Sequence, residues 1–276
     1  MGPFPIFLRA RAVGIYLLLG LLLVCIGAGP WWGYVLVIGG TFTIAYFGTT
    51  QIGSHFYLPT HCQGKDKALK QVVLTFDDGI LNPKQTQQVL AILANYQAKA
   101  AFFCIGKNLQ TPAQKATLQQ IHQAGHIIGN HSFSHANLFD FYGQKRVVKE
   151  IEQTDTLIEA LIGVRPLFFR PPYGITTPNI AQALHQLPHQ TIGWSLRSLD
   201  TVIKKEPLLL QRLQKKLHPS AIILMHDHVS SIPKVLPLFL DYLLKEGYTV
   251  VGLDELLHLP AYSCLLYTSP SPRDRG

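Results

Sequence analysis

Charged residues are scarce in this chain. Asp, Glu, Lys and Arg make up 14% of its 276 residues, against roughly a quarter in ordinary soluble domains, and none of them lies between Ala12 and Gly64. Four cysteines, without any metal or redox spacing, are too few for a disulfide scaffold. The net charge of +8 is spread over lysine-rich segments, with no basic patch interleaved with aromatics. We therefore expect no nucleic-acid partner, and no feature indicates a protein partner.

The uncharged segment holds two apolar runs, residues 12–29 and 31–49, with a Pro-Trp-Trp-Gly stretch at their junction. Each run approaches the roughly 20 apolar residues that a helix needs to cross a bilayer, and the aromatic residues suit a membrane interface. We predict that residues 1–64 form a membrane anchor, a hairpin of two transmembrane helices. The alternative is a cleaved signal peptide followed by a buried helix, although no clear small-residue cleavage site precedes polar sequence.

The charges that flank this segment bear on its orientation. Arg9 and Arg11 favour a cytoplasmic N-terminus. Two full spans would then return the rest of the chain to the cytoplasm, in agreement with Lys65, Lys67 and Lys70. One span followed by a re-entrant segment would place it outside. We expect an inner-membrane protein, with both topologies open.

The last residues, 264–276, differ in character from the rest. Their sequence reads well as the translation of a nucleotide string that resembles a transposase-tagging sequencing adapter. We expect them to be read-through from an assembled contig, and the alternative is a Pro/Ser-rich disordered tail. Resequencing the locus distinguishes the two, and we leave these residues out of the fold prediction.

Residues 65–263 alternate short apolar runs with amphipathic segments. Short buried strands that alternate with helices are typical of parallel β/α units, and about seven strands favour a (β/α) barrel over an open sheet. In such barrels the active site lies at the C-terminal ends of the strands. The expected strands are residues 71–76, 100–105, 126–129, 167–170, 191–195, 221–225 and 248–251.

Polar residues gather where these strands end. Asp77 and Asp78 follow the first strand, where one carboxylate can bind a metal while its neighbour acts as a base, although an Asp-Asp-Gly turn alone is weak evidence. His131 and His135 follow the third strand. A spacing of four residues puts both imidazoles on one face of a helical turn, where both can reach one ion.

Three further segments follow later strands: residues 170–174, 194–200 and 224–226. Each is weak alone, but their order after successive strands makes coincidence implausible. Together with residues 75–79 and 131–135, they resemble the five motifs of carbohydrate esterase family 4, the NodB-type polysaccharide deacetylases. The resemblance covers roughly residues 70–257 and implies a distorted (β/α) barrel that removes acetyl groups from sugars with the help of a metal.

The resemblance also implies a metal site. Asp78, His131 and His135 would bind a divalent ion, most commonly zinc, with cobalt, manganese and nickel as alternatives. Three protein ligands leave positions open for water and substrate.

The remaining roles come from the same resemblance. Asp77 would be the general base, and Arg170 would keep it ionised and oriented. The backbone N–H of Tyr173 would help to stabilise the oxyanion. His226 would be the general acid, held protonated by Asp200. Leu224 would line the acetyl pocket, and Trp194 and Pro171 would contribute to substrate binding.

The chain departs from the family pattern at three positions. Ile80 stands where Pro often follows Asp-Asp-Gly, Thr201 replaces a Trp that often shapes the acetyl pocket, and Arg197 stands where a second acidic residue is common. None of these changes touches the three expected metal ligands, so the enzyme prediction stands and the acyl-group preference is open.

The sequence therefore predicts a membrane-anchored, metal-dependent deacetylase of N-acetylglucosamine-type residues in a bacterial cell-wall or surface polysaccharide. One alternative is a deacylase or deformylase of a lipid-linked sugar at the cytoplasmic membrane face. Another is a non-catalytic, membrane-tethered glycan-binding protein. The partners expected are an acetylated glycan and the membrane.

Overall fold

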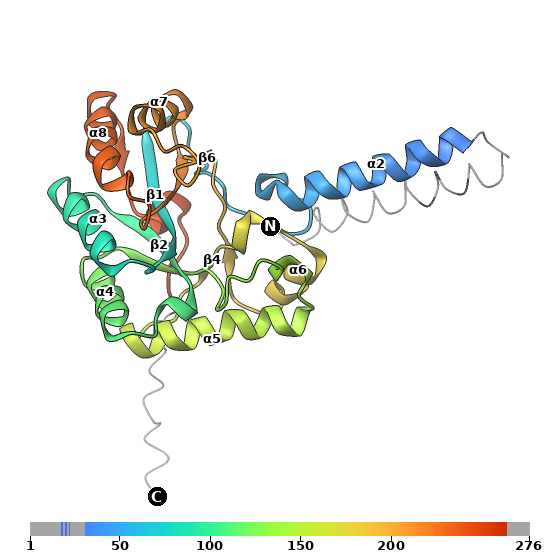
Figure 1. Cartoon of the computed structure of the whole chain (residues 1–276), viewed down its shortest axis with the longest axis horizontal. Coiled ribbons are helices and arrows are strands. Elements are labelled where there is room, and N and C mark those ends of the chain that lie inside the picture. The colour runs from blue at the N-terminus through green and yellow to red at the C-terminus, as the bar shows by residue number, and fades with distance from the viewer. Residues whose placement is uncertain (1–17, 19, 21, 23–30, 264–276) are drawn as a thin grey trace, which may run out of the picture.

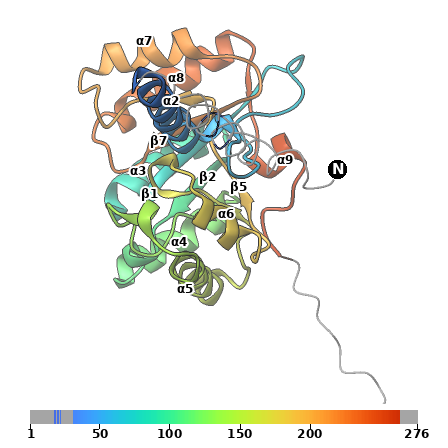
Figure 2. The same cartoon turned by 90° about the vertical axis from the view of Figure 1, so that its right-hand side faces the viewer.

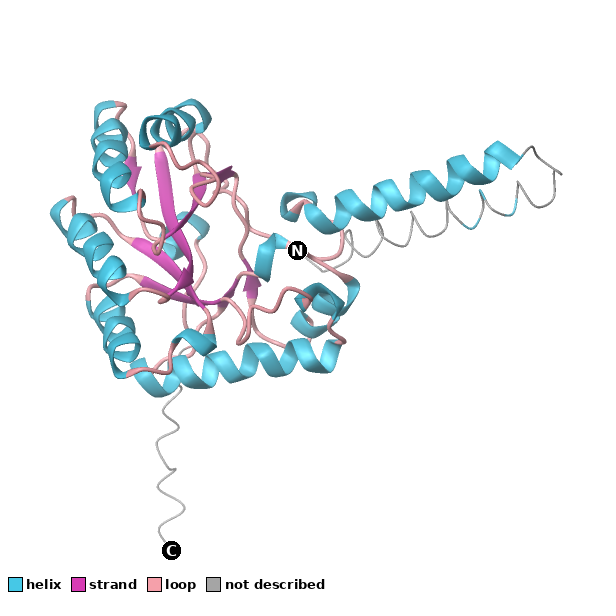
Figure 3. Ribbon diagram, in the orientation of Figure 1, coloured by secondary structure: helices cyan, strands magenta, loops and turns pink. Residues whose placement is uncertain are grey.

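The computed structural model describes residues 31–263 together with residues 18, 20 and 22. Within this part of the chain, helices surround a sheet of parallel strands (Figure 1, Figure 3). The strands are β1 (Gln71–Gly79), β2 (Ala100–Cys104), β3 (Ile127–Asn130), β4 (Phe168–Phe169), β5 (Gln190–Thr191), β6 (Leu196–Arg197), β7 (Ala221–His226) and β8 (Thr249–Val250). The helices are α2 (Trp31–Thr50), α3 (Pro83–Asn95), α4 (Pro112–Gln123), α5 (Gln144–Ile162), α6 (Pro178–Leu184), α7 (Glu206–Lys216), α8 (Ile232–Lys245) and α9 (Leu253–Leu257).

The sheet is an open half-barrel, which confirms the predicted α/β barrel class. Its strands follow the order β5-β4-β3-β2-β1-β7-β6, and β8 pairs with β1. The edge strands β5 and β6 come from consecutive parts of the chain, where the sequence predicted a single strand over residues 191–195. That prediction was wrong, because the chain changes partner there: the Ile192 N–H donates to the Phe169 oxygen, but the Ser195 N–H donates to the Ile222 oxygen.

Local sequence signals place the helices. Thr111 caps α4: its hydroxyl accepts a hydrogen bond from the Gln114 N–H, and the Gln114 side chain accepts one from the Thr111 N–H, as in a capping box. Helix α5 buries Val147, Ile151 and Ile158 along the face that the spacing predicts. These helices, with α3, α7 and α8, cover the outside of the sheet (Figure 1).

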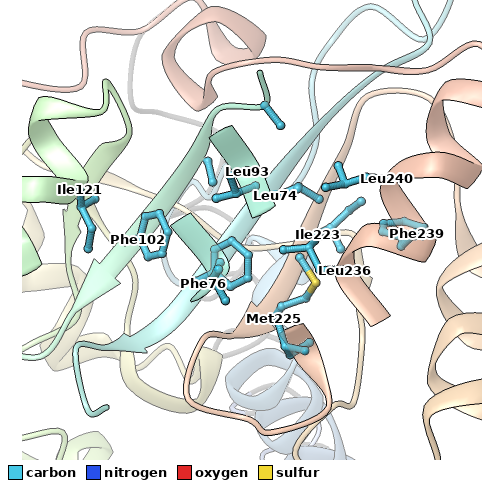
Figure 4. Packing of buried hydrophobic residues seen from close by; sticks show 14 of the residues in the cluster. Leu74, Phe76, Leu93, Phe102, Ile121, Ile223, Met225, Leu236, Phe239 and Leu240 are labelled. Carbon is cyan, nitrogen blue, oxygen red and sulfur yellow. The ribbon is translucent and has the colours of Figure 1, made fainter. Parts of the chain in front are cut away.

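Alternation along β1 places its apolar side chains in two of the clusters that form the core. Leu74 and Phe76 point outward and pack with residues of α3 and α8 (Figure 4). Val73 belongs to a second apolar cluster with residues of β2, β4, β7 and α9. Because successive strand residues point to opposite faces, Thr75 and Asp77 share the side of Val73. These polar side chains therefore lie on the same side of the sheet as the second cluster, nearer to the C-terminal ends of the strands.

Helix α2 coincides with the second predicted apolar run. Residues Trp32–Thr50 are long and apolar enough to cross a membrane, and 6% of that window is buried. The first predicted helix, residues 12–29, lies outside the described residues except for positions 18, 20 and 22, and so does the predicted tail at 264–276. The hairpin therefore stays a prediction.

His126 makes the stability of the fold depend on pH. The residue is 5% exposed, and its Nδ1 atom accepts a hydrogen bond from the Ala100 N–H at 3.2 Å, so this bond requires an Nδ1 atom without a proton. Burial and, secondarily, the charge of Lys99 lower the pKa of His126 to about 4. At pH values between about 4 and 6.5, the ring binds a proton in the unfolded chain but not in the folded one. This contribution to stability is therefore present above about pH 6.5 and is lost as the pH falls toward 4.

We expect His126→Asn to flatten the acid-side loss of stability. The asparagine Oδ1 atom can accept the same N–H bond but does not titrate, so up to about 3 kcal/mol of the pH-dependent change should disappear. Unfolding in urea, measured from pH 7 to pH 4 in detergent, checks this. His258→Asn, at an exposed position, is the matched control and should leave the pH dependence unchanged. Equal slopes for native protein and His126→Asn would contradict the assignment.

Candidate active site

Both carboxylates at the end of β1 reach the same site because the strand bends there. Regular alternation would send Asp77 and Asp78 to opposite faces. Instead, the pairing of β1 with β2 shifts register between Phe76 and Gly79, and Asp78 adopts a left-handed backbone with φ 62°. Irregularities of this kind re-aim side chains at strand ends. As a result, both carboxylates line one pocket.

The two histidines after β3 converge on Asp78. The Nε2 atoms of His131 and His135 lie 3.7 and 3.5 Å from the Asp78 Oδ1 atom. The predicted helical turn was wrong: residues 131–135 form an irregular loop in which Ser132 and His135 have positive φ. The imidazoles nevertheless meet, with ring centroids 4.8 Å apart.

The donor chemistry of these three residues fits a metal ion. Their ligating atoms lie within 4.8 Å of one another. The Nδ1 atom of His131 lies 2.8 Å from the carbonyl oxygen of Arg170, which only accepts, so Nδ1 carries a proton and Nε2 is the nitrogen that faces the cluster. Burial and the neighbouring His131 lower the pKa of His135 to about 4, so this ring is neutral at pH 7, as a metal ligand must be.

Arg170 lies under Asp77 and is fully buried. Its Nη1 atom donates to the Asp77 Oδ1 atom at 2.6 Å and to the Thr75 hydroxyl at 2.9 Å. The Nε and Nη2 atoms donate to the carbonyl oxygens of Ile192 and Gly193. The guanidinium is therefore held both by β1 and by the Ile192–Gly193 segment, which connects β5 to β6.

Asp77 is ionised in this setting. Burial alone would raise the pKa of its carboxyl, but the charges of Arg170, His131 and His226 and the Arg170 hydrogen bond lower it below its ordinary value. The Asp77 Oδ2 atom lies 3.8 Å from the Nε2 atom of His131. Asp77 therefore offers a negative oxygen beside the Asp78–His131–His135 cluster.

His226 faces the cluster from the end of β7. Its Nε2 atom lies 4.0 Å from the Asp78 Oδ2 atom, and its Nδ1 atom lies 2.9 Å from the Oδ1 atom of the buried Asp200. The second oxygen of Asp200 accepts the His226 backbone N–H at 2.7 Å. Burial opposes protonation, but the Asp200 hydrogen bond and the nearby carboxylates raise the pKa of His226 above its ordinary value.

The turn after β4 forms one wall. Tyr173 has φ 60° in the short 3₁₀ turn η4 (Pro172–Gly174), and its ring lies 4.6 Å from that of His135. The Gly174 backbone passes so close to Trp194 that a Cβ atom would lie 2.3 Å from the indole. Only glycine fits at this contact.

The pocket between these groups has a volume of about 210 Å³. Its lining includes the predicted Trp194, Leu224 and Tyr173, whereas Pro171, at the start of the η4 turn, is buried and does not line it. Arg170 and Asp200 also lie outside the lining, and they contact Asp77 and His226, which line it. Arg197 and Thr201, which depart from the family pattern, both line the pocket.

Sequence reasoning missed the residues that hold the histidine loop. The Glu150 carboxylate, on α5, accepts hydrogen bonds from the N–H groups of Phe133 and Ser134 and from the Ser134 hydroxyl. Asn130 accepts the Ser132 N–H and donates to Asp155 of the same helix. A buried Glu on the apolar face of α5 was the available signal, but its partners are distant in sequence.

Comparison with known proteins agrees with this geometry. Residues 64–192 match the polysaccharide deacetylase family. A peptidoglycan-N-acetylglucosamine deacetylase of Bacillus cereus is 32% identical over 73% of this chain and 75% of its own length. The peptidoglycan-N-acetylmuramic acid deacetylase PdaA of Bacillus subtilis is 29% identical over 68% of this chain and 72% of its own.

A solved structure supports the same relationship. The peptidoglycan N-acetylglucosamine deacetylase Bc1960 superposes with a TM-score of 0.68 and 25% identity, covering 74% of this chain and 95% of its own. The parallel half-barrel, the ordered motifs at its strand ends and these relatives lead to one assignment. The chain belongs to the NodB-type polysaccharide deacetylases of carbohydrate esterase family 4, which are hydrolases.

Proposed function

We propose that this protein removes N-acetyl groups from N-acetylglucosamine-type residues of a bacterial cell-wall or surface polysaccharide, with a divalent metal as cofactor. The observation that carries the proposal is the convergence of a buried, ionised Asp77 and a carboxylate-paired His226 on either side of the Asp78–His131–His135 cluster. The N-acetyl sugars named for its relatives agree with this substrate class.

Asp78, His131 and His135 would hold the metal. Two imidazoles and one carboxylate suit zinc best and leave coordination positions free. The bound ion would supply Lewis-acid polarisation of the acetyl carbonyl and a lowered pKa for water. The protein supports this by fixing the His131 tautomer through the Arg170 carbonyl.

Asp77 and His226 divide the proton transfers. The charge and hydrogen bond of Arg170 keep Asp77 ionised, so Asp77 can take the proton of the attacking water. His226, whose pKa is raised by Asp200, can donate a proton to the departing amine nitrogen. Two titratable groups whose environments push their pKa values apart are the pattern that acid–base catalysis requires.

The pocket walls would position the acetyl group. Leu224 provides an apolar surface and is 3% exposed, and Trp194 closes the wall beside Gly174. The backbone N–H of Tyr173 would stabilise the oxyanion. A cavity of about 210 Å³ suits an acetyl group and part of one sugar ring rather than a long acyl chain.

The test is release of acetate by the purified full-length protein from acetylated chito-oligosaccharide and from peptidoglycan. We expect turnover that disappears after chelation and returns with zinc. Absence of turnover on every acetylated glycan, with metal bound, would contradict the proposal and favour a glycan-binding role.

Glu150→Ala should weaken metal binding without touching a ligand. It removes three hydrogen bonds that hold the 131–135 loop, and loss of an outer partner typically costs about 10- to 100-fold in metal affinity. Competition with a chromogenic chelator measures the zinc Kd. Glu152→Ala, at an exposed position on the same helix, is the control. An unchanged zinc Kd in Glu150→Ala would show that the loop needs no support from α5.

A further inference from the structure

The C-terminal end of α2 is hydrogen-bonded to Thr176, in the loop that directly follows the turn η4 in the wall of the site. The Thr176 N–H donates to the Thr49 oxygen at 3.0 Å, and the Thr176 hydroxyl donates to the Gly48 oxygen at 3.4 Å. Thr176 is buried and lies three residues after Tyr173. Figure 1 shows α2 leaving the body on the side of α6 and β6, and Figure 2 shows the same helix nearly end-on.

The C-terminal end of α2 packs closely against the chain segment that leads to the barrel. A Cβ atom on Gly48 would lie 2.6 Å from the Phe56 ring, so the helix end is packed against the segment that follows it. That segment buries Ile52 and Leu58, and its His61 N–H donates to the Thr191 oxygen of β5 at 2.8 Å. The barrel therefore has a fixed height and orientation relative to α2.

The length of α2 sets that height. Its 20 residues span about 30 Å, which equals the hydrocarbon thickness of a bilayer. If α2 crosses the membrane, Thr49 lies at the edge of the hydrocarbon. Three residues of chain reach at most about 11 Å, so Tyr173 lies within the headgroup layer or directly above it.

Apolar side chains are exposed on the same part of the rim. Leu138 is 63% exposed, Phe141 is 78% exposed and Tyr173 is 45% exposed. The Tyr173 hydroxyl donates to the Asn137 side chain at 3.1 Å, so the residue that precedes the 138–141 segment lies beside η4. Aromatic and apolar residues at this depth are typical of membrane interfaces.

We propose that the Leu138–Phe141–Tyr173 rim rests in the interface of the membrane that α2 crosses, and that the substrate is an acetylated saccharide attached to a lipid of that membrane. This rests on the proposed deacetylase function and narrows its substrate. A site held at the headgroup layer meets sugars that are linked to lipid at a higher local concentration than glycan farther from the membrane.

The test compares two probes with the same sugar. The full-length protein is reconstituted in phosphatidylglycerol/phosphatidylethanolamine vesicles and given either soluble N-acetylchitotetraose or the same tetrasaccharide coupled through its reducing end to a phospholipid in the vesicle. Acetate release is measured at equal probe concentration. We expect the lipid-linked probe to be hydrolysed at least tenfold faster.

A lipid-linked probe could also react faster only because it shares a vesicle with the enzyme. Substitutions at the rim distinguish that effect from contact between the rim and the membrane. L138E/F141E should remove most of the preference for the lipid-linked probe and change turnover of the soluble probe less than twofold. Leu244→Glu, on α8 and equally exposed at 63%, should change neither. Equal rates for both probes in the native protein, or an unaltered preference in L138E/F141E, would overturn the proposal.

A crosslinking measurement tests the contact between the rim and the membrane independently of enzyme activity. The photoreactive residue p-benzoylphenylalanine in place of Phe141 should crosslink to radiolabelled lipid, and in place of Leu244 it should not. Hydrolysis of neither probe, with no acetate released from peptidoglycan either and with metal bound, would contradict the deacetylase function itself. In that case, absence of the Phe141 crosslink would refute the interfacial rim as well, and its presence would support the rim alone.

Discussion

Replacing Asp77 by asparagine is expected to lower kcat by about 10³-fold while zinc affinity stays unchanged. Asparagine has the same shape and keeps an oxygen for the Arg170 hydrogen bond, but it cannot accept the proton of the attacking water. Loss of a general base typically costs about 10²- to 10⁴-fold. The proposed metal ligands Asp78, His131 and His135 are not changed, so the effect should fall on the chemical step.

The neighbouring Asp78→Asn should give the opposite pattern. Its carboxylate lies closest to both imidazoles, so we expect zinc affinity to fall by more than the 10- to 100-fold typical of an outer-shell change, with activity recovering in part at high zinc. Kinetics and zinc titration of both variants check this contrast. If Asp77→Asn lost zinc and Asp78→Asn kept it, the two roles would have to be exchanged.

Much of the fold was predictable because its signals are local. Helix α5 follows from its apolar spacing, and α4 follows from its Thr-Pro start, since both depend on residues within one or two turns. The break between β5 and β6 was not predictable. It arises because residues 192–195 leave β4 and join β7, and apolar content alone carries no information on which neighbour a strand segment meets.

The candidate site shows the same division. The polar residues at strand ends stand out in an apolar sequence, so Asp77, Asp78, His131 and His226 were identified, and the structure brings them together. The conformation that joins them was not predictable: the left-handed backbone at Asp78 and the irregular His131–His135 loop depend on contacts from other elements. Such locally strained positions are expected at functional sites.

Replacing Arg170 by methionine is expected to destabilise the protein by about 3 to 5 kcal/mol. The side chain is fully buried and is the ion-pair partner of Asp77 at 2.6 Å. Methionine fills much of the same volume but leaves the Asp77 carboxylate buried without its counter-charge, which is the costly way to break a buried pair. The carbonyl oxygens of Ile192 and Gly193 would lose their donors too.

The double variant D77N/R170M tests whether the uncompensated Asp77 charge is the cause of the destabilisation in Arg170→Met. With no charge left at position 77, part of the stability should return, so the double variant should be more stable than Arg170→Met alone. Urea unfolding of the four proteins, with metal removed so that no ion offsets the Asp77 charge, gives the coupling energy between the two sites. A double variant less stable than Arg170→Met would contradict this account. The main role of Arg170 would then be to hold the Ile192–Gly193 segment through its carbonyl oxygens, rather than to compensate the charge of Asp77.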